Sequence, residues 1–344
     1  MEYYAGIDVS LEQSSVCIVD EKGQIIREAK VSSEPAALAA LFAGLAFPVI
    51  RIGLEAGPLS QWLHAGLTDA GYEVVLLETR HVKAALSAMT VKTDRKDARG
   101  IAQLLRMGWF RSVHRKSLPA QETRVLLTAR KLLLGKMIDI EVAIRGLLRG
   151  FGLKVGLASR LGFAGRVHEL IAGQAMLESV IEPLLRCREA LRTEFAKLHR
   201  QLLAIVRQDG ICRRLMTAPG VGPVVALTFT SAIDDPARFK SSRAVGAHFG
   251  LTPRKYQSGE TDVSGGITKA GDAMVRATLY EAALVLLFKA RPSSLKAWGM
   301  MVARRRGAKR ALVAVARKLA TVLHRMWVDG SEFHWNREEG AASA

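Results

Sequence analysis

The chain has 344 residues, 49% hydrophobic and 24% charged, which is typical of globular proteins and long enough for two or three domains. It shows no basic-then-apolar leader, no apolar run of about 18 residues and only three widely spaced cysteines, which argues against secretion, membrane spanning and a disulfide scaffold. Its net charge of +18 favours a polyanionic partner.

The positive charge is distributed unevenly along the chain. Residues 1–112 hold 12 Lys and Arg against 13 Asp and Glu, whereas residues 113–344 hold 38 against 19. We therefore expect the second region to provide most of the electrostatic attraction to a nucleic acid. The alternative is a basic composition without a binding role.

Residues 1–112 alternate strand and helix signals. Three strands are expected first, because short apolar runs flank the turn Asp20–Gly23. A helix, a strand, a helix, a strand and a helix follow. The expected strands are 3–9, 15–19, 25–31, 49–54 and 73–77, and the expected helices are 34–45, 60–70 and 94–107. This order predicts an α/β domain of the RNase H-like type.

Residues 113–209 are expected to be helical. A helical pattern from Gln121 to Leu148 is followed by a glycine-rich break, and then by a seven-residue repeat of apolar residues from Leu177 to Ile205. The repeat is typical of a coiled-coil seam, with a kink or a helix restart at Pro183. The two helices would form a hairpin that reaches out or pairs with another subunit, or a bundle packed on its own chain.

Residues 210–335 are expected to form a mainly helical domain, followed by a tail at 336–344. Gly220 and Gly222 lie between two apolar helical stretches, as in a helix-hairpin-helix turn that offers backbone N–H groups to DNA phosphates. Tight turns also use glycine for steric reasons alone. A further nucleic-acid contact is expected at a cluster of cations rather than a merely solvated helix face: Arg304, Arg305, Arg306, Lys309 and Arg310.

Four carboxylates occupy positions that solubility does not explain. Asp8 and Glu55 each end an apolar strand, while Asp94 and Asp97 are three residues apart at a helix start and project to one face. A charge at a buried sheet edge is costly unless it is paired or bound to a metal. Oxygen-rich sites select Mg²⁺ or Mn²⁺, which support phosphoryl transfer. Taken singly, each acid has an ordinary alternative role as a helix cap, an arginine partner or a turn residue.

Six segments spanning nearly the whole chain resemble the signatures of the DEDD insertion-sequence transposases, which are bridge-RNA-guided recombinases with a RuvC-like N-terminal domain. The segments are 6–8, 55–58, 92–99, 219–222, 249–259 and 268–272. The resemblance implies that Asp8, Glu55, Asp94 and Asp97 bind the metal and that Ser258 is the catalytic serine. Thr268 departs from the pattern, since many relatives have serine there.

The resemblance also implies an activity and its partners. The expected activity is excision and insertion of an insertion sequence, by site-specific DNA cleavage and rejoining through a covalent phosphoserine. The expected partners are DNA, a structured guide RNA and further copies of the chain, as a dimer or tetramer, in the prokaryotic cytoplasm at the nucleoid. Arg254 and Lys269 lie within the matching segments and are expected to contact nucleic acid.

Without the resemblance, Ser258 would be read as a turn residue. We expect it in an exposed polar loop beside Gly259, where the backbone can approach a phosphate. A nucleophilic serine needs a base or a metal, and the nearest histidine in sequence, His248, is ten residues away. Metal held by the N-terminal acids would activate the serine if the two halves of the chain meet.

Three alternatives stay open at this point. A Holliday-junction-type nuclease would use the four acids and water, which leaves Ser258 without a role. An actin-like ATPase or sugar kinase also begins with a segment like Gly6–Ser10, but it needs a second phosphate loop and an adenosine site that the chain does not show. A non-enzymatic nucleic-acid scaffold would leave the four acids unexplained.

Overall fold

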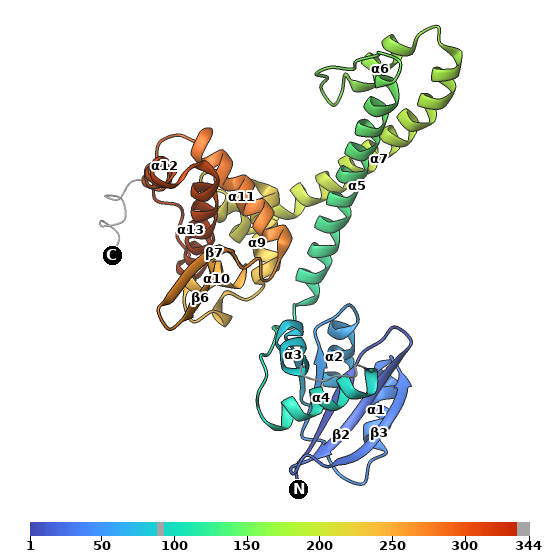
Figure 1. The fold of residues 1–344 in the computed structure, drawn as a ribbon, viewed down its shortest axis with the longest axis vertical. Coiled ribbons are helices and arrows are strands. Elements are labelled where there is room, and N and C mark those ends of the chain that lie inside the picture. Colours follow the sequence, from blue (N-terminus) through green and yellow to red (C-terminus); the bar gives the residue numbers. More distant parts are fainter. Residues whose placement is uncertain (88–92, 336–344) are drawn as a thin grey trace. The chain divides into compact units, whose positions relative to one another are not determined.

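The computed structural model describes residues 1–87 and 93–335. The expected tail at 336–344 and Lys92, in the third of the matching segments, lie outside the described residues. The chain divides into two compact units, Met1–Lys116 and Ser117–Ala344, which are described one by one (Figure 1). Within the described part of the chain, no helix is long and apolar enough to cross a membrane.

A five-stranded mixed sheet forms the centre of the first unit. Its strands are β1 (Tyr3–Asp8), β2 (Gln13–Asp20), β3 (Ile25–Ser32), β4 (Arg51–Glu55) and β5 (Val74–Leu77). They lie in the order β3-β2-β1-β4-β5. The first three strands are antiparallel neighbours, β4 is parallel to β1, and β5 is parallel to β4. The predicted α/β class and the five predicted strands are confirmed.

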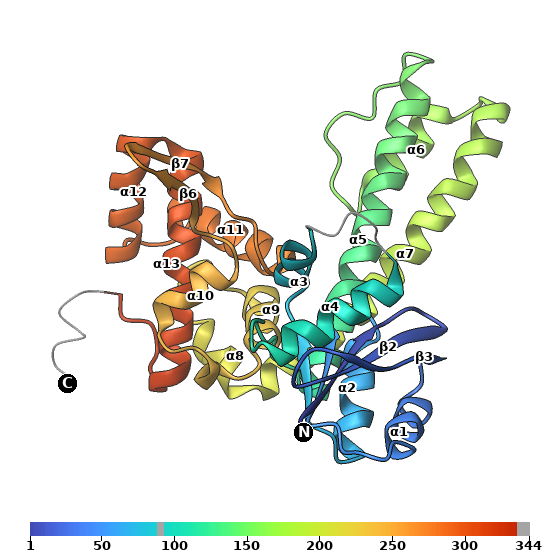
Figure 2. The same ribbon diagram turned by 60° about the horizontal axis from the view of Figure 1, so that its bottom comes forward.

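Helices cover both faces of this sheet. On one face, α1 (Pro35–Ala43) and α2 (Ser60–Asp69) share a core with strand residues such as Ile7 and Leu54. On the other face lies α4 (Asp94–Arg106), as Figure 2 shows from a second direction. A short helix that the sequence pattern did not predict, α3 (Thr79–Leu86), follows β5.

Two strand glycines allow α4 to lie close to the sheet. A Cβ atom on Gly6 would be 2.2 Å from the carbonyl oxygen of Ala98, and one on Gly53 would be 2.5 Å from Cδ1 of Leu105. Both positions therefore face α4. Side chains alternate between the two faces of a strand. Asp8 is two residues beyond Gly6 in β1, and Glu55 is two residues beyond Gly53 in β4, so both acids also face α4.

The second unit begins with a long helical hairpin. Its helices are α5 (Leu118–Arg149) and α7 (Ala175–Gln208), which lie side by side in both ribbon views (Figures 1 and 2). A short unpredicted helix, α6 (Phe163–Ile171), packs at their far end around the buried Phe163 and Ile144. α7 continues through Pro183, so the helix does not restart there.

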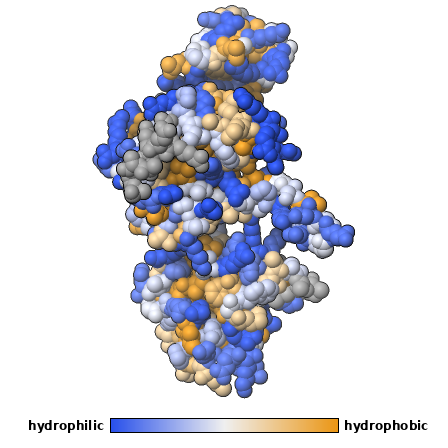
Figure 3. Space-filling model, turned by 90° about the vertical axis from the view of Figure 1, so that its left-hand side faces the viewer, coloured by the Kyte–Doolittle hydropathy of each residue, from blue (hydrophilic) through white to orange (hydrophobic). Residues whose placement is uncertain are grey.

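The rest of the second unit is mostly helical, which confirms the prediction for this region. Its core is formed mainly by α9, α11 and α13, which contribute residues such as Phe229, Leu279 and Leu319. The elements, in chain order, are α8 (Gly210–Leu215), α9 (Pro223–Ile233), η1 (Pro236–Arg238), α10 (Ser242–His248), β6 (Pro253–Ser258), β7 (Thr261–Ile267), α11 (Ala273–Phe288), α12 (Ser294–Arg306) and α13 (Ala308–Asp329). Figure 3 shows one face of the molecule, on which hydrophilic and apolar residues intermingle.

Candidate functional site

Two of the expected acids lie side by side at one edge of the sheet. Asp8 is the last residue of β1, Glu55 is the last residue of β4, and the preceding pair, Ile7 and Leu54, is in parallel register. Both acids are half-buried and line the same hollow of about 340 Å³. The structure brings Asp8 and Glu55 together because parallel strands in register end at the same edge.

Helix α4 runs antiparallel to β1, so its first turn lies at this same edge. At the far end of α4, the side-chain amide of Gln103 donates a 2.7 Å hydrogen bond to the carbonyl of Gly23, in the turn next to the start of β1. Nearer its beginning, Ala98 lies against Gly6. The residues before Ala98 therefore continue past Gly6 in the direction of Asp8.

The first turn of α4 carries the other two expected acids. Asp94 precedes Ala98 by one turn and so lies over β1 and β2, against which Ala98 packs. Asp97 precedes Ile101 by one turn and so lies toward β4 and β5, since Ile101 packs with Leu77 of β5. Asp94 is exposed and Asp97 is half-buried.

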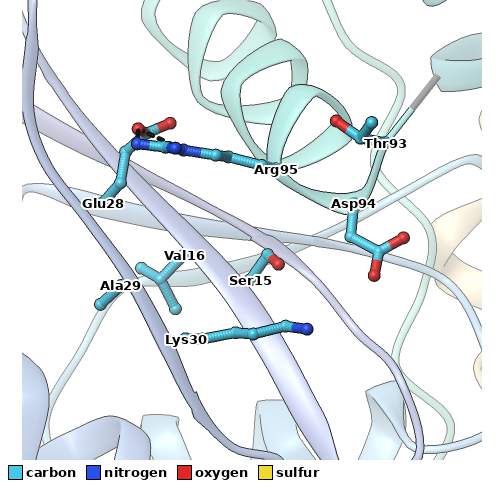
Figure 4. A pocket seen from close by; sticks show the side chains of 8 residues that line it. All are labelled: Ser15, Val16, Glu28, Ala29, Lys30, Thr93, Asp94 and Arg95. Atoms are coloured by element: carbon cyan, nitrogen blue, oxygen red, sulfur yellow. Dashed lines mark hydrogen bonds and ion pairs between the residues drawn. The ribbon is translucent and has the colours of Figure 1, made fainter. Parts of the chain in front are cut away.

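A second hollow, of about 450 Å³, lies between the start of α4 and strands β2 and β3. Figure 4 shows Asp94 on one side of it, with the hydroxyl of Ser15 and the ammonium of Lys30 on the other. Ser15 is directly opposite Asp8 in β1 and opposite Lys30 in β3, so these three side chains form one row across the α4 face. Sequence reasoning missed Ser15 and Lys30, because their pairing depends on a register shift between Ile18 and Val19 of β2 that the hairpin pattern does not show.

An ion-pair cluster ties the start of α4 to β3. The Glu28 carboxylate accepts a 2.6 Å hydrogen bond from Nε of Arg95 and a 3.0 Å hydrogen bond from Nη2 of Arg99 (Figure 4 shows the Arg95 pair). These hydrogen bonds, from Arg99 first and Arg95 second, lower the pKa of Glu28 to about 2. Glu28 is therefore ionised at neutral pH and fixes the helix end that carries Asp94.

The carboxylates suit a hard divalent cation, but the structure does not gather all four into one set. Asp8 and Glu55 share a hollow, Asp94 lines the neighbouring one, and Asp97 lies on the adjacent side of the same helix turn. Among the described residues, no group of three or more His, Cys, Asp or Glu is placed to hold one metal ion. The donor chemistry fits, because each group offers the oxygen ligands that Mg²⁺ and Mn²⁺ prefer.

Ser258 lies in the second unit, on a β-hairpin rather than in the expected loop. It is the last residue of β6, is exposed, and pairs with Thr261, the first residue of β7. Gly259, in the two-residue connection, has a φ of +55°, which glycine adopts without strain. The serine hydroxyl thus stands at the tip of an exposed two-stranded arm.

The base of this hairpin is fixed by close backbone packing. A Cβ atom on Gly250 would be 2.2 Å from the amide nitrogen of Ala270, and one on Gly271 would be 2.3 Å from the carbonyl oxygen of His248. Nη1 of Arg276 donates to the carbonyls of Ala270 at 2.5 Å, Gly271 at 3.0 Å and Phe249 at 3.2 Å. One guanidinium therefore holds both ends of the segment that carries Ser258.

In the expected helix-hairpin-helix turn, packing requires one of the two glycines. Gly220 has a φ of +81°, and a Cβ atom there would be 2.2 Å from the carbonyl oxygen of Ala282 in α11. The N–H of Val221 donates to the carbonyl of Ala218 at 3.1 Å, so the turn itself uses this donor. Nothing lies within 4 Å of the position that a Cβ atom would take on Gly222, so packing does not require glycine there. The steric explanation therefore accounts for Gly220 and leaves Gly222 as the candidate phosphate contact.

The expected cationic contacts are on the surface of the second unit. Arg254 is exposed in β6, and Lys269 has a left-handed backbone with a φ of +55° at the hairpin base. The basic cluster lies at the junction of α12 and α13, and all its members are exposed: Arg304, Arg305, Arg306, Lys309 and Arg310.

Known transposases are similar to both halves of the chain. The sequence profile of the DEDD transposase family of IS110 matches residues 5–152, and that of the transposase family IS116/IS110/IS902 matches residues 212–298. The transposase for insertion sequence element IS1111A of Coxiella burnetii is 29% identical over 92% of this chain and 87% of its own length. A putative transposase of Sinorhizobium fredii is 29% identical over 86% of this chain and 76% of its own length.

Among solved structures, RuvC of T. thermophilus in complex with a Holliday junction substrate covers 33% of this chain and all of its own chain. Its sequence identity is 14% and its TM-score 0.26, which is too low to define the fold. Family membership instead rests on two sequence profiles that match separate halves of the chain and on relatives that align over most of its length. The chain belongs to the DEDD insertion-sequence transposase family.

Proposed function

We propose that this transposase excises and inserts an insertion sequence by site-specific cleavage and rejoining of DNA through a covalent phosphoserine at Ser258. The observation that carries the proposal is the adjacency of Asp8 and Glu55 at one sheet edge, where the first turn of α4 also lies. Paired carboxylates of this kind suit phosphoryl transfer. The exposed hydroxyl of Ser258 supplies the nucleophile that a water-using nuclease would not need.

We assign the first unit to the RNase H-like class, in its RuvC-like form. Support comes from the strand order β3-β2-β1-β4-β5, in which three antiparallel strands are followed by two that run parallel to the first. In this class the acids of the first and fourth strands converge, as Asp8 and Glu55 do.

We further propose that Asp8, Glu55, Asp94 and Asp97 hold a divalent cation, Mg²⁺ or Mn²⁺. When bound, such an ion would supply positive charge that stabilises the attacking and leaving oxygens of phosphoryl transfer. The chain's own contribution is the placement of α4, which Gly6 allows to approach the sheet.

The proposed cleavage step replaces one phosphoester bond with another, so the number of phosphoester bonds is unchanged. The hydroxyl oxygen of Ser258 attacks the scissile phosphorus and loses its proton to solvent or a nearby base. A Ser–O–P bond forms, and the bond from phosphorus to a sugar oxygen breaks, so the sugar leaves with a hydroxyl group. Reversal with the hydroxyl of a new strand rejoins the DNA and releases the serine, without a nucleotide cofactor.

The second unit would hold the nucleic acids. Its exposed cations and the net charge of residues 113–344 support contacts with DNA, and also with a structured guide RNA. Gly222 would contact a phosphate through the helix-hairpin-helix-like turn. We propose that α5 and α7 form a coiled-coil element through which copies associate, because Val125, Leu132 and Val142 of α5 are more than half exposed.

Charge-neutral substitutions of the acids test the metal-assisted part of the proposal. Asp8→Asn and Glu55→Gln should lower DNA cleavage in Mg²⁺ by about a hundredfold or more, because they remove metal ligands. DNA binding should stay close to wild type, since most of the basic charge lies beyond residue 112.

Asp69→Asn is the matched control for these variants. Asp69 is exposed at the end of α2, on the sheet face opposite the acids. This control should cleave like the wild-type chain. Cleavage at the wild-type rate by Asp8→Asn would refute the assignment of the acids.

A further inference from the structure

The exposed hairpin β6–β7 has two chemically different faces. Side chains alternate along each strand, so Arg254, Tyr256 and Ser258 share one face. Across the hairpin, Tyr256 is paired with Val263 and Ser258 with Thr261, which extends the same face onto β7. We call this the serine face.

On the opposite face of the hairpin, the charged side chains form an ion pair with each other. Lys255 and Gln257 point to that side, and Nζ of Lys255 lies 3.2 Å from a carboxylate oxygen of Asp262. Its charges are therefore neutralised within the hairpin, whereas the serine face presents a guanidinium, an aromatic ring and a hydroxyl.

Tyr256 is the unusual member of the serine face. Its side chain is 67% exposed and that of Val263 beside it is 56% exposed. Among the residues that the structure describes, none provides the Tyr256 ring with a stacking partner or its hydroxyl with a hydrogen bond. Exposing an aromatic ring and an isopropyl group side by side is unfavourable in water, so the pair is suited to a partner that covers it.

The spacing along β6 indicates what that partner is. Tyr256 precedes Ser258 by two strand positions, which is about 7 Å, of the order of the length of one nucleotide. A strand whose phosphate lies at Ser258 would thus place a neighbouring nucleobase over Tyr256 and a neighbouring phosphate near Arg254. Aromatic rings bind nucleobases of any sequence, because every base has a flat π-face.

We propose that Tyr256 is a positioning residue that stacks on the nucleobase next to the phosphate attacked by Ser258. The ring would hold an unpaired base of the DNA strand, and Arg254 would hold its backbone. The inference rests on the proposed role of Ser258, but it concerns a different contact and can fail separately.

Substitutions of Tyr256 and of its nucleobase test this contact together. The substrate is a DNA duplex spanning one element end and its flank, left unpaired around the cleaved phosphate and either intact or abasic at the nucleotide beside that phosphate. On intact DNA, Tyr256→Leu should lower both affinity and covalent adduct formation by about tenfold to a hundredfold. Tyr256→Phe should stay within about threefold of wild type, because the stacking ring remains.

The abasic substrate provides the decisive comparison. Removing the base should lower the affinity of the wild-type chain for DNA as much as Tyr256→Leu lowers it on intact DNA. It should not lower the affinity of the Tyr256→Leu variant further. Gln257→Ala, on the paired face of the same strand, is the control and should respond to the abasic site like wild type. Equal abasic losses in wild type and Tyr256→Leu would overturn the proposal, as would wild-type affinity in Tyr256→Leu.

Failure of the serine mechanism would look different. In that case no protein–DNA adduct would form with any variant, including wild type, while the affinity measurements on intact and abasic DNA would still report on Tyr256. Loss of the base contact with retention of an adduct at Ser258 would leave the proposed function in place and remove only the role of Tyr256.

Discussion

At the scale of single residues, the acids are positioned by two glycines that carry no side chain. Gly6 and Gly53 lie opposite Ala98 and Leu105, and a Cβ atom on either would overlap α4. The sequence shows these glycines within apolar strands, where glycine is otherwise unfavourable. Their function in the fold is to let α4 approach, which brings its first turn to the sheet edge.

Gly6→Ala should therefore disturb both stability and catalysis. The added methyl would be 2.2 Å from the carbonyl oxygen of Ala98, so α4 must move away. We expect a loss of about 1–3 kcal/mol in the free energy of unfolding, typical of overpacking, and reduced cleavage at temperatures where the variant is still folded. Both are measured by thermal unfolding and a DNA cleavage assay on the same sample.

Gly135→Ala in α5 serves as the control for this substitution. Nothing lies within 4 Å of the position a Cβ would take there, and the residue is inside a helix. The control should gain about 0.5–1 kcal/mol of stability. An unchanged cleavage rate and melting temperature in Gly6→Ala would contradict the positioning role of the glycine.

Residue by residue, the sequence located the acids better than their surroundings. Asp8 and Glu55 were predictable because each ends an apolar strand, and parallel strands place their ends together. The pairing of Glu28 with Arg95 was not, because it depends on the register of β3 and on the rotation of α4 about its axis. Neither quantity is encoded in a local pattern.

At the scale of elements, the hairpin that carries Ser258 was also not predictable from a local sequence pattern. Every residue of β6 is exposed, so the strand lacks the alternation of apolar and polar residues by which strands are recognised. A polar, glycine-bearing segment is read as a loop on that basis. An isolated two-stranded hairpin is marginal in water, and the contacts at its base must supply its order.

Arg276 is the residue on which that base depends most. Arg276→Met removes the donors to the three carbonyls while keeping an apolar stem in place of the half-buried arginine. Because hydrogen bonds to charged groups contribute about 1.5–3 kcal/mol, amide hydrogen exchange in residues 250–271 should accelerate about tenfold or more. Formation of the Ser258 adduct should fall with it.

Arg207→Met is the control for the loss of one positive charge. Arg207 is exposed in the last turn of α7. Exchange in residues 250–271 should be unchanged in this control. If Arg276→Met left the exchange rates of these amides at wild-type values, the guanidinium would not be what orders the hairpin.

At the scale of the whole molecule, charge separates the two parts of the chain. The acidic residues proposed for the chemistry lie in a region whose charges nearly balance, and the excess of positive charge follows residue 112. Binding free energy gained from released counterions would thus come mainly from the second unit. Exposed positive charge in the second unit is concentrated in the cluster at the α12–α13 junction.

Neutralising this cluster should flatten the salt dependence of DNA binding. With Arg304, Arg305, Arg306, Lys309 and Arg310 all changed to Gln, the slope of log affinity against log salt should fall by about 0.9 for each one that contacts a duplex phosphate. The control changes Arg186, Arg192 and Lys197 of α7 to Gln in the same way. Each of these three cations is paired with a glutamate, so the control should keep the wild-type slope. Equal slopes for the cluster variant and wild type would show that the cluster is only a solvated surface.

The central claim is that Ser258 becomes covalently bound to DNA. Labelled DNA carrying the element end should give a denaturant-resistant adduct with the wild-type chain, and peptide mapping should place the phosphate on Ser258. Ser258→Ala should give no adduct and no rejoined strands, while binding DNA normally because the exposed serine bears no part of the core. Free DNA ends produced by Ser258→Ala at the wild-type rate would contradict the claim and favour a nuclease that uses water.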